Sequence, residues 1–401
     1  MQFFGFHLMP YPYLPDEHRR SRESTWVTLS NSHFDPRLGH ALYQRYLDEL
    51  VLYDQLGFDG ICVNEHHQTA YGLMPAPNVV AGMLVPRTRG KIAILGNALS
   101  LRDHPLRIAE EVAILDVASG GRVISGFVRG IGAEYHTFGL DPTQSRERFH
   151  EAHDLIVRAW TEPGPFEWYG QHYKLRYVNP WPRPLQQPHP PIWSPSQGSA
   201  ETVDWAARHR YTYLQTFSDT ATIKRVFSEF RDAAGRHGYT SSPSQLGWSV
   251  PVYVADTDAE ARLAACTHLD YLFNTLLRMP RDMFFPPGYL TAQSAPRVMG
   301  AKRGLGTARA EPADLLDRGL ALAGSPESVR QQIEHYQHEL GFGIFSGVFQ
   351  FGSLGHEEFE RSVRLFATQV MPALRAPGQA EPGHADPGRA EPDPAGGSGA
   401  R

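Results

Sequence analysis

The chain of 401 residues has a formal net charge of −5 and a sequence pI near 6.4, so it lacks the basic surface that a nucleic-acid partner requires. Apolar residues make up 41% of the chain, which is enough for a sizeable core and excludes global disorder. The two cysteines, Cys62 and Cys266, have no metal-site spacing and fit a reducing compartment better than a disulfide scaffold.

The amino-terminal residues do not resemble a targeting signal. Met1 to Phe6 are apolar, but no basic leader precedes them and Pro10 and Pro12 follow soon after. No stretch approaches the roughly 20 apolar residues that span a bilayer. We therefore expect a soluble, cytoplasmic protein without a membrane partner.

Strand and helix patterns alternate about eight times along the chain. Strands are predicted at 3–9, 60–63, 91–95, 122–125, 191–193, 211–216, 246–254 and 343–349. Helices are predicted at 41–56, 77–84, 145–160, 201–208, 221–236 and 357–371, and others begin at 105, 258 and 325. Residues 164–181 alternate like a hairpin. The pattern predicts an α/β fold with an all-parallel sheet, and eight units favour a closed (β/α)8 TIM barrel.

The barrel domain is expected to cover residues 1–375. Residues 284–310 break the periodicity and predict a long mobile insertion, which is either a lid or an ordinary loop. Residues 376–401 repeat Ala-Glu-Pro-Gly, Ala-Asp-Pro-Gly and Ala-Glu-Pro-Asp before ending in glycine and serine. Such a tail cannot bury a core, so we expect it to be disordered.

Chemistry in a barrel of this kind sits at the carboxyl ends of the strands, and Glu65-His66-His67 follows the second strand. Adjacent residues of a strand point to opposite sides, so at most one histidine faces the barrel mouth. No third ligand is spaced to make a metal site. The alternative is one packed histidine and one at the surface.

A second candidate site lies between the fifth strand and the following helix. Gly198, Ser199 and Thr202 stand at a helix amino terminus, where free N–H groups and the helix dipole favour phosphate. The alternative is that Ser199 only caps the helix. Arg129 lies in the glycine-rich stretch 126–132, which is not a dinucleotide fingerprint, and it could instead make an ordinary ion pair. Hydrolase, zinc-protease and P-loop motifs do not occur.

Together these residues resemble the luciferase-like family of flavin-dependent monooxygenases, relatives of the bacterial luciferase α subunit. The matching stretches are Glu65-His66-His67, Leu95-Gly96-Asn97, His104 to Arg107, Leu115 to Arg122, Gly126 to Gly130, Phe138-Gly139, Ser145 to Phe149 and Ser325 to Val329. The likeness covers about residues 1–375. These motifs are specific for the family but not for a substrate.

The resemblance implies a homodimeric barrel that uses reduced FMN, supplied by a separate NAD(P)H-dependent flavin reductase, and O2 as co-substrate. His66 matches a catalytic histidine that handles a C4a-peroxyflavin, with Glu65 and His67 as its neighbours in the motif. Asn97 would lie beside the flavin ring, as would Val79 and Val80, where relatives have an unusual peptide link. Gly198, Ser199 and Thr202 would hold the FMN phosphate, with Arg129 nearby.

The expected reaction is oxygenation of a hydrophobic small molecule, such as a carbonyl or aromatic compound, by hydroxylation or Baeyer-Villiger chemistry. The chain departs from the family at Phe127 and Val128, which replace its usual glycine pattern before the arginine. Two alternatives stay open: an F420-dependent hydride-transfer oxidoreductase of the same fold, and a non-catalytic flavin-binding barrel that tolerates loss of His66.

Overall fold

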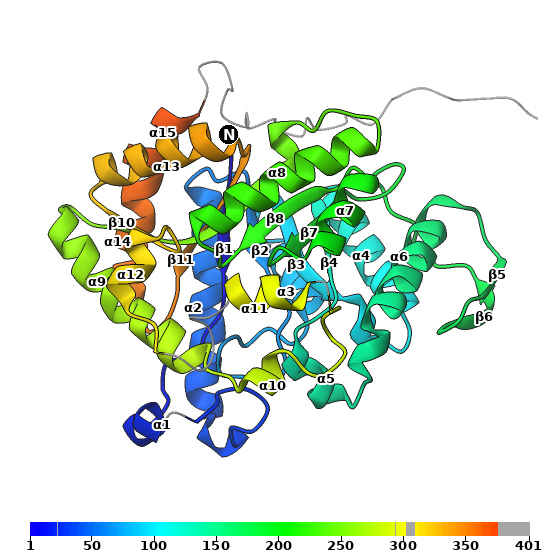
Figure 1. Cartoon of the computed structure of the whole chain (residues 1–401), viewed down its shortest axis with the longest axis horizontal. Coiled ribbons are helices and arrows are strands. Elements are labelled where there is room, and N and C mark those ends of the chain that lie inside the picture. Colours follow the sequence, from blue (N-terminus) through cyan, green and yellow to red (C-terminus); the bar gives the residue numbers. More distant parts are fainter. Residues whose placement is uncertain (22, 293, 302–308, 376–401) are drawn as a thin grey trace, which may run out of the picture.

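The computed structural model describes residues 1–21, 23–292, 294–301 and 309–375. Parallel strands form its centre (Figure 1). The barrel strands are β1 (Gln2–His7), β2 (Gly60–Val63), β3 (Lys91–Ala98), β4 (Val123–Val128), β7 (Ile192–Ser196), β8 (Thr212–Thr216), β9 (Leu246–Val254) and β11 (Ile344–Gln350).

The sheet closes on itself. The strand order is β1-β2-β3-β4-β7-β8-β9-β11, β11 pairs with β1, and every pairing in this ring is parallel. Inside the ring, Phe4 of β1 meets Trp193 of β7 with ring centroids 4.9 Å apart, so side chains fill the interior. The predicted (β/α)8 barrel is confirmed.

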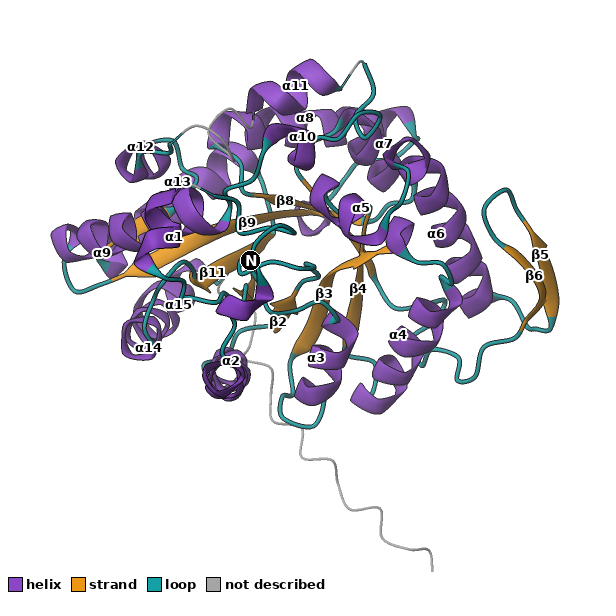
Figure 2. Cartoon of the chain, turned by 90° about the horizontal axis from the view of Figure 1, so that it is seen from below, coloured by secondary structure: helices purple, strands orange, loops and turns teal. Residues whose placement is uncertain are grey.

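Helices surround the strands, as the view along the barrel in Figure 2 shows. They are α1 (Asp16–Ser21), α2 (Pro36–Gln55), α3 (Pro77–Leu84), α4 (Leu106–Ser119), α5 (Gly132–Phe138), α6 (Ser145–Thr161), α7 (Ala200–Arg208), α8 (Thr220–Arg236), α9 (Asp258–Tyr271), α10 (Arg281–Phe284), α11 (Ala295–Ala301), α12 (Pro312–Asp317), α13 (Pro326–Leu340), α14 (His356–Leu365) and α15 (Met371–Leu374). Short 3₁₀ turns (Asn31–His33, Leu99–Leu101, Pro142–Gln144 and Pro243–Gln245) and π-helical turns (Leu272–Leu276 and Phe366–Val370) complete the helical structure. Among the helices that the structure describes, none combines the length and the apolar character that a membrane span needs.

Local capping explains where the helices begin and end. Ser325 caps α13, with Pro326 at its first position, as predicted from the sequence. Helix α2 begins at Pro36 rather than at the predicted residue 41, because Asp35 accepts a 2.7 Å hydrogen bond from the Arg37 backbone N–H and so caps the helix earlier. Gly120, at φ 70°, ends α4 in the left-handed conformation that glycine favours.

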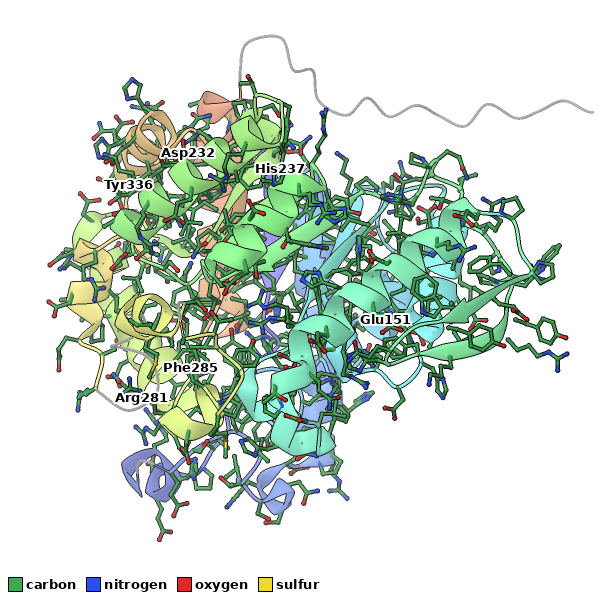
Figure 3. The ribbon with its side chains drawn as sticks, turned by 45° about the vertical axis from the view of Figure 1, so that its right-hand side comes forward. Glu151, Asp232, His237, Arg281, Phe285 and Tyr336 are labelled. Carbon is green, nitrogen blue, oxygen red and sulfur yellow. The ribbon has the colours of Figure 1, made fainter. Side chains whose placement is uncertain are left out.

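The predicted hairpin is present as β5 (Phe166–Tyr169) and β6 (Lys174–Val178), which pair antiparallel. It extends away from the ring of helices in Figures 1 and 2. Glu151 on α6, labelled in Figure 3, anchors it by accepting hydrogen bonds from the Trp168 indole N–H at 3.1 Å and from the backbone N–H of His172 at 2.8 Å.

Several short elements were not predicted from the sequence, among them α1, α10 and α12. Helix α5 begins inside the glycine-rich stretch 126–132, for which no helix was predicted, and β10 (Leu322–Gly324) is a three-residue strand beside β9, outside the ring. The predicted insertion at 284–310 contains α11, and its residues 293 and 302–308 lie outside the described part of the chain. The tail at 376–401, expected to be disordered, also lies outside it.

Gly126 lets β4 approach β3 closely. A methyl group at this position would lie 2.2 Å from the Ile94 carbonyl oxygen, which the sheet holds in place. We expect Gly126→Ala to lower the free energy of unfolding by about 1–3 kcal/mol. In the control Gly235→Ala, the new methyl group has open space on α8 and should stabilise by up to about 1 kcal/mol. Urea unfolding measures both variants, and an unchanged midpoint for Gly126→Ala would contradict this packing.

Candidate active site

A cavity of about 220 Å³ lies at the carboxyl ends of the barrel strands. Figure 2 looks onto this end of the barrel, where α5 and α10 lie in front of the strands. Residues at or just beyond the strand ends line its inner part: Phe6, Asn64, Leu95, Val128, Pro195 and Thr216. The loops after the strands supply the outer wall. The position agrees with the general rule for barrel enzymes.

His66 is the member of the predicted triplet whose imidazole lines the cavity together with an acidic partner. Its Nδ1 lies 3.1 Å from Oε1 of Glu134, a carboxylate on α5 that is almost fully buried. Oε2 of Glu134 accepts a 2.8 Å hydrogen bond from the Ile131 backbone N–H. No hydrogen bond within the described residues engages Nε2 of His66, and 19% of its side chain remains exposed. Nε2 is therefore the ring nitrogen that can exchange a proton with a bound molecule.

The carboxylate of Glu65 contacts the imidazole of His67, not that of His66. Its Oε1 lies 2.7 Å from Nε2 of His67, while Oε2 accepts hydrogen bonds from the Ala98 backbone N–H at 3.1 Å and from Arg102 Nη2 at 2.9 Å. The Glu65 carboxylate is thus fully engaged, although Glu65 borders the cavity. His67 does not line the cavity and packs edge-on against Phe138. The two histidines point to different sides, as strand alternation predicted.

Aromatic side chains hold His66 in place. Trp26 and Tyr71 stack with ring centroids 5.3 Å apart, and each presents an edge-on contact to His66 at 5.2 and 5.1 Å. The Trp26 indole N–H donates a 2.9 Å hydrogen bond to the Leu276 carbonyl. The neighbouring Val27 has φ 56°, a strained conformation for a β-branched residue. Strain of this kind persists only where the surroundings enforce it and clusters near functional sites.

The predicted anion site borders the same cavity. Ser199 caps α7 by accepting from the Thr202 backbone N–H at 3.3 Å, and its hydroxyl donates to Thr202 Oγ1 at 2.7 Å. Both residues line the cavity, so Ser199 caps the helix and also borders the cavity, and phosphate binding there stays a prediction. Arg129 lines the cavity as well, and its Nη1 donates to Ser145 Oγ at 3.2 Å.

Arg146, at the start of α6, adds a second guanidinium to this end of the cavity. Its Nη2 forms an ion pair with Glu201 Oε2 at 3.7 Å, which is too far for a hydrogen bond. This buried nitrogen therefore has no hydrogen-bond partner among the described residues. Burial and the charge of Arg129 both lower the pKa of Arg146. Two positive groups, hydroxyls and a helix amino terminus form a donor set that an anion would complete. A phosphate group fits these residues.

His150, one turn along α6 from Arg146, also borders the cavity. Burial, with the charge of Arg146 next in importance, lowers the pKa of His150 to about 4. Its imidazole is therefore neutral near pH 7, and the positive charge at this end of the cavity comes from the arginines.

A closing segment, residues 281–292, covers the anion end. The Tyr289 hydroxyl donates to the Gly130 carbonyl at 2.5 Å, and Arg129 lies over the Tyr289 ring with its guanidinium carbon 4.4 Å from the centroid. Thr291 Oγ1 donates to Glu201 Oε1 at 2.7 Å. Phe284, and Phe285 labelled in Figure 3, add apolar surface to the cavity wall. This contact supports the lid interpretation, which stays a prediction.

Several residues predicted to bind the flavin lie elsewhere. Asn97 is fully buried but does not line the cavity: β3 shifts register after Ile94, and Oδ1 of Asn97 accepts from Asn78 on α3 at 2.9 Å. Val79, 58% exposed, and Val80 belong to α3 and are also absent from the wall. The Val79–Val80 peptide bond is not cis, since each cis peptide bond among the described residues precedes a proline. Gly198, at φ 92°, forms the turn before α7 without lining the cavity.

Residues of the site that were not predicted as functional include Trp26, Asn64, Glu134 and Arg146. Trp26 lies in a stretch without periodicity, and only contacts between distant segments bring it to His66. Asn64 precedes the triplet, lines the cavity and is 5% exposed, with Oδ1 lacking a partner. Arg146 stands within a stretch that carried the family resemblance, which was the available indication of its role.

The comparison with known families agrees with these motifs. A family model described as luciferase-like monooxygenase matches residues 25–342, most of the chain. The chain belongs to this family. The resemblance predicted from the sequence is confirmed.

Curated relatives include enzymes with different substrates. Over 189 residues the chain is 32% identical to the alkanal monooxygenase alpha chain of Photorhabdus luminescens, covering 46% of this chain and 51% of that protein. Over 329 residues it is 26% identical to the 4-hydroxyprotoasukamycin monooxygenase of Streptomyces nodosus subsp. asukaensis, covering 80% and 83%. The matches to the first three relatives span 58%, 51% and 64% of their lengths.

Solved structures share the barrel. The oxygenating constituent of 3,6-diketocamphane monooxygenase from Pseudomonas putida, in complex with FMN, aligns with a TM-score of 0.68 at 19% identity over 94% of this chain and 100% of that one. An F420-dependent secondary alcohol dehydrogenase aligns at 0.65 and 16% identity over 93% and 99%. At these identities the likeness establishes the fold alone.

Proposed function

We propose that the protein is a flavin-dependent monooxygenase that uses reduced FMN and O2 to oxygenate a neutral, mainly apolar organic molecule. One observation carries the proposal: a single cavity joins an anion site at one end to His66 and an aromatic wall at the other. Such a cavity suits a ligand with a phosphate tail and a reactive ring that meets a second, apolar molecule beside a proton donor.

The anion end fits the phosphate of FMN. Arg129 and Arg146 would supply charge-assisted hydrogen bonds, Ser199 and Thr202 their hydroxyls, and α7 its amino-terminal N–H groups. Arg146 Nη2 makes no hydrogen bond to the described residues, although it lies 3.7 Å from Glu201 Oε2. When bound, reduced FMN supplies the two electrons with which O2 yields one oxygen atom for the substrate and one for water.

His66 would handle the proton that this chemistry requires. A histidine titrates near neutrality and serves as a general acid or base when its geometry is fixed. Trp26, Tyr71 and Glu134 fix the ring, and Nε2 remains available. The surrounding apolar side chains exclude bulk water, which would otherwise compete for the reactive oxygen.

The wall around His66 sets the substrate class. Trp26, Tyr71, Phe285, Leu277 and Met279 offer apolar surface to a substrate. The carboxylates of Glu65 and Glu134 already accept hydrogen bonds from protein donors. A neutral carbonyl or phenolic compound is therefore preferred over a carboxylate of similar size, and the Asn64 amide remains for a polar contact.

The flavin reductase and the homodimer are further parts of this proposal. As the family resemblance implies, reduced FMN would be delivered by a separate NAD(P)H-dependent reductase. Apolar side chains are exposed on α3 (Val79 and Met83) and α4 (Ile114 and Val117), and a homodimer would bury such a surface.

Anaerobic titration with reduced FMN and, in parallel, with reduced F420 tests the proposal. We expect FMN to bind and F420 to bind much more weakly. Mixing the FMN complex with isotopically labelled O2 and a panel of neutral aldehydes, ketones and phenols should then place one labelled oxygen atom in the product. Binding of F420 alone, with reduction of a carbonyl compound under anaerobic conditions, would establish the hydride-transfer alternative instead.

A further inference from the structure

Each of the adjacent histidines has its own buried carboxylate, and the carboxylate of His66 comes from a distant part of the chain. Glu134 is separated from His66 by 68 positions and reaches it from α5. Its side chain is 1% exposed, and both of its oxygens are engaged, one with His66 Nδ1 and one with the Ile131 backbone N–H. The position of this carboxylate is therefore fixed from two sides.

We propose that Glu134 is the positioning residue of His66: it holds the proton of the neutral imidazole on Nδ1 and leaves Nε2 bare toward the cavity. This inference rests on the proposed function for its catalytic meaning, but the geometry stands independently. An ionised carboxylate only accepts hydrogen bonds, so Nδ1 at 3.1 Å from Oε1 must carry the hydrogen. The same carboxylate stabilises the imidazolium that forms when Nε2 takes up a proton.

The His66 imidazole cannot easily turn toward another hydrogen-bond partner. Trp26 and Tyr71 contact His66 edge-on, so rotation of the imidazole would collide with one of them. The neighbouring Glu65 is already used by His67, Arg102 and the Ala98 backbone N–H. Glu134 is therefore the carboxylate that sets the tautomer of His66, and Glu65 sets that of His67.

The variant Glu134→Gln separates this role from simple packing. The Ile131 N–H group can only donate, so the glutamine oxygen must face it and the glutamine NH2 must face His66. Nδ1 then has to accept, and the hydrogen of the neutral ring moves to Nε2. The substitution preserves shape but inverts the tautomer on the side of the cavity.

Glu358 provides a matched control outside the cavity. Its Oε2 accepts from the Gly355 backbone N–H at 3.0 Å at the start of α14, and its Oε1 lies 3.3 Å from Nε2 of His268. Glu134 makes a similar pair of contacts at the start of α5, with a backbone N–H and with Nδ1 of an imidazole, but its side chain is 1% exposed against 46% for Glu358. Glu358→Gln therefore gives a lower bound on the stability effect of losing such a carboxylate, without touching the candidate site.

Nitrogen NMR of the full chain with isotopically labelled histidine measures the tautomer directly, at a pH where the ring is neutral. The His66 signals are assigned by their absence in His66→Asn. We expect a protonated Nδ1 and a bare Nε2 in the native protein, and the reverse in Glu134→Gln. In turnover, Glu134→Gln should lower kcat by about 10–100-fold with little change in KM or in FMN affinity, while Glu358→Gln leaves all three unchanged.

A native His66 that carries its proton on Nε2 would overturn the proposal, even if Glu134→Gln fails to fold. So would an unchanged tautomer in Glu134→Gln, or a variant that loses stability to the same extent as Glu358→Gln but keeps its kcat. If the native protein shows the expected tautomer yet oxygenates nothing, the positioning role stands and the monooxygenase proposal fails. The two failures are therefore distinguishable.

Discussion

His66→Ala is expected to lower kcat by about 10²–10⁴-fold, the range for loss of a positioned acid or base. The affinity for reduced FMN should hardly change, because in the proposed function Arg129, Arg146 and the hydroxyls of Ser199 and Thr202, not His66, would hold the phosphate. Among the described residues that line the cavity, the other imidazole is that of His150, and burial, followed by the charge of Arg146, lowers its pKa to about 4. Steady-state oxygenation with an external supply of reduced FMN measures the effect.

His67→Ala is the control for His66→Ala. His67 neighbours His66 in the chain but faces Phe138 and Glu65 outside the cavity. We expect this variant to lose stability, because Glu65 loses a buried partner, and to keep most of its kcat. Equal losses of kcat in both variants would contradict the assignment of His66. Full activity of His66→Ala would favour the non-catalytic flavin-binding barrel.

The sequence was sufficient to predict the fold because the patterns that mark strands and helices are local. Strand β9 and helix α3 have the predicted boundaries, since alternation in one and a proline start in the other mark them clearly. Strands β3 and β4 run three residues further than predicted, through Gly96 and Gly126. Pairing with the neighbouring strands keeps these residues extended, and the sequence of one strand does not show how far this pairing continues.

The candidate site was predicted less completely, because its contacts join distant segments. His66 and the pair Ser199 and Thr202 line the cavity, whereas Asn97 turns away from it. The shift of register in β3 that reorients Asn97 depends on its neighbour β4. In the sequence, Glu134 has no feature that distinguishes it from an ordinary residue in the first turn of a helix. Its contact with His66 joins segments that are distant in the chain and depends on the folded barrel.

Arg146→Ala is expected to weaken binding of reduced FMN by about 10–150-fold, the equivalent of one charge-assisted hydrogen bond. Arg146 Nη2 makes no hydrogen bond to the described residues and has only the 3.7 Å ion pair with Glu201, so the guanidinium can donate to a phosphate. Removing it also leaves the Glu201 carboxylate, now 3.7 Å from Arg146, without its nearest positive charge and able to repel the phosphate. Riboflavin, which lacks the phosphate, should bind equally well to the native protein and to Arg146→Ala.

The ratio of the affinity for FMN to the affinity for riboflavin therefore shows whether Arg146 contacts the phosphate. General damage to the cavity would weaken binding of both ligands and leave this ratio unchanged. Arg158→Ala is a control on the same helix, since Arg158 pairs with Glu162 at the surface and is absent from the cavity wall. Arg146→Lys should recover part of the loss, because lysine keeps the charge but not the fork of donors. If Arg146→Ala weakened FMN and riboflavin equally, Arg146 would contact the flavin away from its phosphate, and the anion end would need another ligand.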